Sequence, residues 1–360
     1  MVAHLSGSAR PDATGGYAAR MSARVAGDHF RRMGELSLSS IGLGTYLGPA
    51  DDETDTSYQA AVVRALELGL NVVDTASNYR HQRSERAVGR AMAEAVERGV
   101  VRRDEVIVAS KAGFLAFDGA RPADPRAYYQ SALVDRGLLG WQDVVAGCHS
   151  LAPAYLRDAI EQSRRNLQLE TIDVYYLHNP ETQLDEVAPR VFGQRMRAAF
   201  EAMEQACRDG AIGCYGTATW TGYRVPPTHR GHLSMADLVA LAREVGGPDH
   251  RFRAVQLPYN LSMPEARVMP TQRVGDAQIP ALDAADRLGL YVMSSASIEQ
   301  GKLAVRLPRG RSGDDRLRTP AQRALQFARS APGMGTALVG MKTQRHVEEN
   351  AEVARVQPGP

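Results

Sequence analysis

The sequence predicts an α/β protein that forms one closed (β/α)8, or TIM, barrel with long loops after its third and fifth strands. Two observations predict this fold. Short apolar or β-branched runs recur about eight times, and each is followed by a longer stretch with helical spacing of its apolar residues. Eight such units in a row favour a closed barrel over an open sheet, and a barrel of this kind accommodates 360 residues in a single domain.

The candidate strands are short and rich in Val, Ile, Leu and Tyr. In chain order they are Ile41–Thr45, Asn71–Thr75, Val106–Lys111, Ile172–His178, Ile212–Thr217, Ala254–Leu257, Tyr291–Ser295 and Thr336–Gly340. Helix signals lie between them. Tyr58–Leu68 has helical spacing and stops at Gly69. Ser84 is predicted to cap the next helix, and Pro153 fits the first turn of a helix over Ala154–Leu167.

Three segments depart from this rhythm. Residues 1–36 are rich in Gly, Ala, Ser and Arg without clear periodicity, so we expect a flexible extension ahead of a barrel over residues 37–360. Ala112–Ser150 and Gly222–Leu233 are longer than ordinary loops. In a barrel both insertions lie on the C-terminal face, where active sites are built.

Composition narrows the class of protein. Lys and Arg total 43 against 41 Asp and Glu, which gives no case for binding nucleic acid or membranes. Three cysteines without a CxxC favour a reduced cytoplasmic compartment. We find no apolar run near the ~18 residues of a membrane span and no apolar core of a signal peptide. Oligomeric state is left open.

Polar residues stand at the ends of three successive strands. Asp74, Lys111 and His178 end the second, third and fourth strands, and Tyr79 follows the first of them. Taken singly, each has an ordinary alternative: a cap or turn residue, a lysine reaching out of the rim, a hydrogen-bonded histidine or a packing tyrosine. Taken together, titratable groups at the C-terminal ends of barrel strands are typical of catalysis.

The chemistry of this set is coherent. A phenol is a poor acid near neutral pH, but a nearby ammonium favours its phenolate. A carboxylate beside the lysine would keep it charged and oriented. A histidine can bond a substrate oxygen or assist proton transfer. The combination suits protonation of the alkoxide that forms from a carbonyl.

Four segments resemble the aldo-keto reductase family. They are DTASNY at 74–79 with SE at 84–85, DVYYLH at 173–178, VQLPYN at 255–260 and EEN at 348–350. The resemblance runs in order from about Ser39 to Ala354. It implies a barrel enzyme that uses NADPH, or NADH, to reduce an aldehyde or ketone. Tyr79 would be the general acid, tuned by Lys111 and Asp74, while His178 orients the carbonyl.

No GxGxxG turn is present, because Gly42, Gly44 and Gly48 have the wrong spacing. The resemblance places the cofactor over the C-terminal rim instead, with Gln256 on the nicotinamide carboxamide. Lys342 follows the eighth strand, where barrels commonly bind phosphate, and could meet a 2′-phosphate; a plain exposed lysine is the alternative. The predicted cofactor residues are Gly44, Thr45, Thr219, Gln256, Ser295, Lys342, Glu349 and Asn350, the last two on the adenine.

The chain differs from the family pattern at three places. Ala218-Thr219 replaces Ser-Asn, Ser295 stands where an aromatic often stacks on nicotinamide, and His346 aligns with a frequent Arg. Trp220 could supply an aromatic face, although core packing is the favoured interpretation. These differences leave the four catalytic candidates intact and leave the choice of NADPH or NADH open.

Other residues of the insertions have weaker signals. His149 could be a second pocket histidine, but we favour a role in anchoring its loop. Adjacent Cys148 lacks metal-ligand spacing, so we expect no metal. Six aromatic residues could form apolar walls for the substrate or merely pack the loops: Phe114, Phe117, Tyr128, Tyr129, Trp141 and Tyr223.

Three functions are consistent with the sequence. The leading one is an NAD(P)H-dependent reductase of a small-molecule carbonyl. The altered cofactor positions motivate a nucleotide-binding regulatory or accessory barrel with weak turnover. A lyase or isomerase using Lys111 as a Schiff base is the third.

Overall fold

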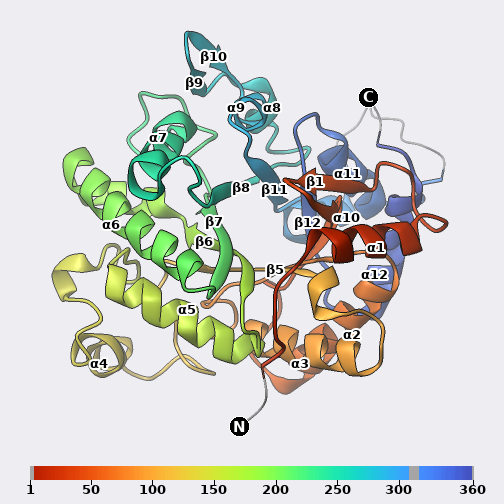
Figure 1. Ribbon diagram of the computed structural model, residues 1–360, viewed down its shortest axis with the longest axis horizontal. Coiled ribbons are helices and arrows are strands. Elements are labelled where there is room, and N and C mark those ends of the chain that lie inside the picture. Colours follow the sequence, from red (N-terminus) through yellow and green to blue (C-terminus); the bar gives the residue numbers. More distant parts are fainter. Residues whose placement is uncertain (1–3, 308–315, 359–360) are drawn as a thin grey trace.

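The computed structural model describes residues 4–307 and 316–358. Eight parallel strands form a closed barrel in the ring order β11-β12-β3-β4-β5-β6-β7-β8 (Figure 1). The predicted (β/α)8 barrel is therefore confirmed. Its strands are β3 Ile41–Gly44, β4 Val72–Asp74, β5 Ile107–Ala112, β6 Ile172–His178, β7 Ile212–Ala218, β8 Phe252–Pro258, β11 Tyr291–Ser295 and β12 Thr336–Gly340.

Helices surround this barrel. They are α2 Asp52–Glu67, α3 Arg83–Glu97, α5 Pro153–Leu167, α6 Pro189–Arg208, α7 Met235–Gly246, α9 Ala281–Arg287, α11 Pro320–Ser330 and α12 Gln344–Ala351. One large apolar cluster lies between strands and helices, and a second, which includes Val72, Ile107 and Val174, fills the barrel interior. The alternation of strands and helices thus buries both faces of every strand, as a parallel sheet requires.

Two of the predicted helix starts need correction. α2 begins at Asp52, well before the periodic stretch, because the Asp51 side chain accepts a hydrogen bond from Thr54 N at 2.8 Å and caps the helix. Ser84 is not the cap of α3, since that helix begins at Arg83. Its hydroxyl instead donates to Thr45 O at 2.9 Å. Pro153 does occupy the first turn of α5.

The floor of the barrel is built by the N-terminal part of the chain. An antiparallel hairpin of β1 Phe30–Met33 and β2 Leu36–Ser39 contributes Met33 and Leu38 to the interior cluster. Helix α1 Pro11–Met21 precedes it, and buried Tyr17 donates to Leu66 O at 2.6 Å.

Residues 4–10, which we name the N-terminal strap, run from the N-terminus up to α1 (Figure 1). Leu5 N donates to Gln168 O at 2.8 Å, and Arg10 N donates to Asp104 O at 3.0 Å. The described part of residues 1–36 is thus packed on the barrel rather than loose. Its partners are distant in sequence, so no local periodicity reveals them; the domain boundary at residue 37 stays a prediction.

The C-terminal face carries more added structure than the two predicted insertions. Ala112–Ser150 folds into α4 Pro125–Tyr129 with short turns of helix at Gln130–Val134 and Trp141–Asp143. Further segments follow two later barrel strands. After β8 come α8 Glu265–Val268 and a hairpin of β9 Gln272–Val274 and β10 Ala277–Ile279, and after β11 comes α10 Lys302–Val305. The hairpin projects from the body of the molecule (Figure 1).

Candidate active site

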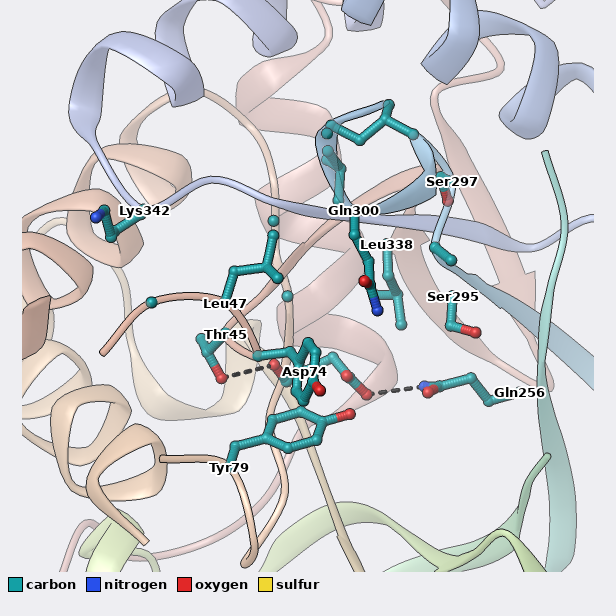
Figure 2. Close-up of a pocket in the computed structure, with 18 of the residues that line it drawn as sticks. Thr45, Leu47, Asp74, Tyr79, Gln256, Ser295, Ser297, Gln300, Leu338 and Lys342 are labelled. Atoms are coloured by element: carbon teal, nitrogen blue, oxygen red, sulfur yellow. Dashed lines mark hydrogen bonds between the residues drawn. The ribbon is translucent and has the colours of Figure 1, made fainter. Parts of the chain in front are cut away.

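A cavity of about 810 Å³ opens at the C-terminal ends of the barrel strands. Figure 2 shows Asp74, Tyr79 and Gln256 at its base, with Lys342 toward one side. All of the predicted cofactor residues line it: Gly44, Thr45, Thr219, Gln256, Ser295, Lys342, Glu349 and Asn350. Asp74, Tyr79 and His178 line it as well, whereas fully buried Lys111 lies behind them. The cavity is of the size and place expected of a ligand site in this fold.

The Lys111 ammonium connects Asp74 to Tyr79. Its Nζ lies 2.6 Å from Asp74 Oδ1 and 3.3 Å from Tyr79 Oη, and it donates to Thr75 O at 2.8 Å. Burial lowers the pKa of Lys111, but the negative charge of Asp74 and the phenol of Tyr79 outweigh it, so the net pKa is raised. The raised pKa and the complete burial of Lys111 favour a charged ammonium, whereas a Schiff-base role needs an accessible neutral amine.

Tyr79 behaves differently from the sequence argument. Burial raises the pKa of its phenol, Lys111 lowers it and Asp74 raises it, and the net pKa is above the usual value. The phenol therefore keeps its proton across the neutral range. The neighbouring ammonium still matters, because it would stabilise the phenolate left after the proton has been given away.

His178 stands at the end of β6, beside the tyrosine. Its ring lies 5.9 Å from the Tyr79 ring and 5.1 Å, at right angles, from Phe114. Burial, Lys111 and His149 hold the pKa of His178 well below its ordinary value, so the imidazole is neutral. Its buried Nδ1 has no partner among the described residues. A neutral ring can give one hydrogen bond to a carbonyl oxygen without bringing in a second charge.

His149 anchors the loop before it, which supports the favoured interpretation. The buried ring bonds His178 O through Nε2 at 2.7 Å and accepts from Gln183 Nε2 at 2.8 Å through Nδ1. Gly113 makes this contact possible. It has a φ of +151°, and a Cβ there would lie 2.6 Å from His178 O and 2.8 Å from His149 Nε2. The backbone at the end of β6 thus needs glycine opposite it.

A strained turn fixes the loop that carries Tyr79. The next three residues, Arg80, His81 and Gln82, have φ values of 47°, 57° and 69°. Such left-handed backbone costs energy in residues other than glycine and persists only where other contacts impose it. Here the buried Arg80 guanidinium bonds Asp55 Oδ1 at 2.6 Å, and Gln82 Nε2 donates to Phe117 O at 3.1 Å. No local sequence pattern predicts this turn.

Several predicted residues take other roles. Glu85, part of the SE motif, is fully buried away from the cavity and accepts from Ser110 Oγ at 2.6 Å. Core packing is wrong for Trp220, which is 43% exposed and lines the cavity. Of the six insertion aromatics, Phe114 alone is among the cavity-lining residues that the described chain supplies. The others pack within the loops, as the stacked rings of Phe117 and Tyr129 illustrate.

Sequence reasoning missed part of the cavity wall. Tyr46 is 53% exposed, and its ring lies 5.0 Å from that of Tyr79. Gln300, on the loop after β11, reaches into the cavity (Figure 2). Asn78 and Asn179 flank the catalytic candidates. Asn78 lies within the DTASNY motif and Asn179 directly follows the DVYYLH motif, and these positions are the signal that could have indicated the two asparagines.

Two absences apply to residues 4–307 and 316–358. No helix there has both the length and the apolar character needed to cross a membrane. The same residues contain no group of His, Cys, Asp and Glu side chains that could hold a metal ion.

Known proteins share this sequence and fold. The chain is 31% identical over 189 residues to deoxymugineic acid synthase 1-D of Triticum aestivum, covering 50% of this chain and 47% of that protein. It is 28% identical over 195 residues to the uncharacterized oxidoreductase YqkF of Bacillus subtilis, covering 52% and 48%. The match thus spans about half the length of these curated relatives.

Solved structures match over most of the chain. Aldo-keto reductase AKR11C1 from Bacillus halodurans, in its holo form, aligns with a TM-score of 0.62 at 21% identity over 92% of both chains. A Klebsiella pneumoniae aldo/keto reductase in complex with NADP and acetate aligns with a TM-score of 0.58 at 20% identity, over 89% and 88% of the two chains. At these identities the alignments show the fold. A family model described as Aldo/keto reductase family matches residues 40–226, more than half of the sequence, and the chain therefore belongs to the aldo/keto reductase family.

Proposed function

We propose that this protein reduces an aldehyde or ketone to an alcohol with NADPH, and that Tyr79 donates the proton. The arrangement of Tyr79, Lys111 and Asp74 at the base of the cavity carries this proposal. The solved Klebsiella relative is in complex with NADP, which supports the choice of cofactor. The substrate would be a small carbonyl compound.

The cavity residues fit a dinucleotide. Asn350 is buried on the wall, and its Oδ1 has no partner among the described residues, so it can accept from an adenine amino group. Lys342 offers a cation near Gly48 for a phosphate. The Nε2 of Gln256 donates to Asp74, so its Oε1 is available to accept a hydrogen bond from the nicotinamide carboxamide. Exposed Trp220 offers the aromatic face that Ser295 lacks.

Each catalytic residue then has a defined task. Bound NADPH would supply a hydride to the carbonyl carbon. His178 and the Tyr79 hydroxyl bond the carbonyl oxygen and orient it, and Tyr79 Oη gives its proton to that oxygen as its negative charge develops. The Lys111 ammonium, 3.3 Å away, stabilises the phenolate, and Asp74 holds that ammonium in place. A proton from solvent restores the phenol after the alcohol leaves.

Replacement of Tyr79 tests the proposal. In Tyr79→Phe we expect kcat for a panel of carbonyls to fall by about 10²–10⁴, because the acid is lost. NADPH binding, followed by protein fluorescence, should persist. Tyr46→Phe is the matched control, since its ring lies beside Tyr79 and makes no bond to Lys111 in the described structure. Normal turnover in Tyr79→Phe would exclude the proposed proton donor.

The same measurements test the second candidate, an accessory barrel with weak turnover. One observation favours it: the Thr219 hydroxyl, at a position where the family usually has Asn, already donates to Gln256 O at 3.4 Å and is therefore partly engaged. NADPH binding by the wild-type chain without turnover of any carbonyl in the panel would support this role.

A further inference from the structure

We propose that Gln256 is a positioning residue for the proton donation by Tyr79. Its side chain orients Asp74, and Asp74 stabilises the charge of Lys111 beside Tyr79. Gln256 thereby connects the proposed nicotinamide site to these catalytic residues. The inference rests on the proposed function and extends it. Its basis is the hydrogen bond that Gln256 Nε2 donates to Asp74 Oδ2 at 2.8 Å, drawn as a dashed line in Figure 2.

This bond crosses the mouth of the barrel. Gln256 lies on β8 and Asp74 on β4, which stand four places apart in the closed ring of eight strands and so face each other. Backbone pairing therefore does not fix their separation, as it does for the neighbouring strands β4 and β5 that carry Asp74 and Lys111. The two side chains meet only because both reach into the barrel.

Both oxygens of the Asp74 carboxylate are used. Oδ1 receives the Lys111 ammonium at 2.6 Å, and Oδ2 receives Gln256 at 2.8 Å. The side chain of Asp74 is 5% exposed, so water cannot readily replace a lost donor. Without Gln256 the carboxylate would turn toward other donors. Its contact with Lys111 would then weaken, because a single orientation of the carboxylate places Oδ1 at Lys111 and Oδ2 at Gln256.

The displacement of Asp74 would change the pKa of Lys111. Asp74 is the main group that raises the pKa of the Lys111 ammonium against the opposing effect of burial. If the carboxylate is displaced, it raises the pKa of Lys111 less, and the lowering effect of burial then prevails. The pKa of Lys111 should therefore fall. Because a bound carboxamide would touch the same Gln256 side chain, the position of the cofactor and the charge beside Tyr79 become linked.

Lysine NMR makes this measurable without turnover. The chain has three lysines, Lys111, Lys302 and Lys342, so a protein labelled at lysine Nζ gives few signals, and Lys111→Arg identifies the relevant one. The cofactor-free protein would be titrated through alkaline pH as wild type, as Gln256→Met and as Asn350→Ala. Met keeps the length of Gln without its donor. Asn350 is the matched control, because it lines the cavity away from Asp74.

We expect the Lys111 titration in Gln256→Met to move down by about one pH unit. In Asn350→Ala it should stay in place. An unchanged Lys111 titration in Gln256→Met, or an equal shift in both variants, would overturn the inference. If Gln256→Met does not fold, as judged by circular dichroism, Gln256→Leu takes its place with the same expected result.

Kinetics separate positioning from cofactor contact. At saturating NADPH, Gln256→Met should lower kcat by about tenfold and move the alkaline limb of its pH profile, whereas Asn350→Ala should raise only the KM for NADPH. If the wild-type protein shows no turnover but the Lys111 signal still shifts in Gln256→Met, the proposed reductase function is wrong and the side-chain coupling stands. Normal turnover with no response of Lys111 would do the reverse.

Discussion

Asp173 belongs to the DVYYLH segment, yet it lies at the floor of the barrel, at the opposite end of β6 from His178. Its Oδ2 accepts from the Arg103 guanidinium at 2.9 Å and from Val108 N at 2.8 Å, while Oδ1 accepts from Ala9 N at 2.7 Å. Asp173 and Arg103 are 4% and 6% exposed. We therefore expect Asp173→Ala to affect stability and to spare catalysis.

The size of the effect follows from burial. Removing one partner of a buried ion pair leaves an uncompensated charge and costs about 3–5 kcal/mol. An unfolding entropy of about 2.1 cal/mol/K per residue gives about 0.8 kcal/mol per degree for 360 residues. The Tm of Asp173→Ala should therefore fall by about 4–7 °C. Replacing Arg103 by Met as well should recover part of the loss, because the unpaired cation is then gone.

Thermal melts and urea titrations would measure this change. The control is Arg197→Ala, because Arg197 and Glu244 form an exposed pair, with side chains 48% and 59% exposed, whose loss should cost at most about 1 kcal/mol. The kcat of the folded Asp173→Ala protein should equal that of wild type. A stability loss no larger than that of the control, or no recovery on removing Arg103, would refute the reasoning.

Two further predictions concern pH and backbone. Burial holds the pKa of His149 at about 4 and that of His29 at about 3, so the unfolded chain binds more protons below its histidine pKa of about 6.5. Stability is then full above about pH 6.5 and falls on acidification, by about 2 kcal/mol per histidine near pH 5; equal pH slopes of Tm in wild type and His149→Gln would contradict this. Gly113→Ala should lower kcat by about tenfold and Tm by a few degrees, because its Cβ meets His178 O; kinetics and a melt equal to wild type would show that the β6 end can yield.

The barrel was predictable because each strand is a compact apolar run with its own helix after it. The convergence of Asp74, Lys111 and His178 was predictable for a related reason. Parallel strands place their C-terminal ends on one face, so residues that end successive strands meet whatever their separation in sequence. The position of these residues at the ends of their strands was therefore enough to predict that they lie together.

Side-chain contacts between distant parts of the fold could not be predicted from the sequence. The bond between Gln256 and Asp74 joins residues 182 positions apart on opposite strands, and no local pattern encodes it. Trp220 was expected in the core because its residue type is usually buried, and only the loop geometry shows it exposed. The raised pKa of Tyr79 likewise depends on burial, which outweighs the ammonium next to it.

The N-terminal strap has a consequence for how the chain folds during synthesis. Residues 4–10 are synthesised well before their partners, which are Asp104, Gln168, Glu170 and Asp173. Its contacts with Gln168, Glu170 and Asp173 therefore cannot form until about half of the chain has been made, and those with Glu170 and Asp173 span 163 and 164 residues. Such long-range contacts form slowly. A nascent chain halted before β6 should leave residues 4–9 open to proteases, and one halted after β6 should protect them.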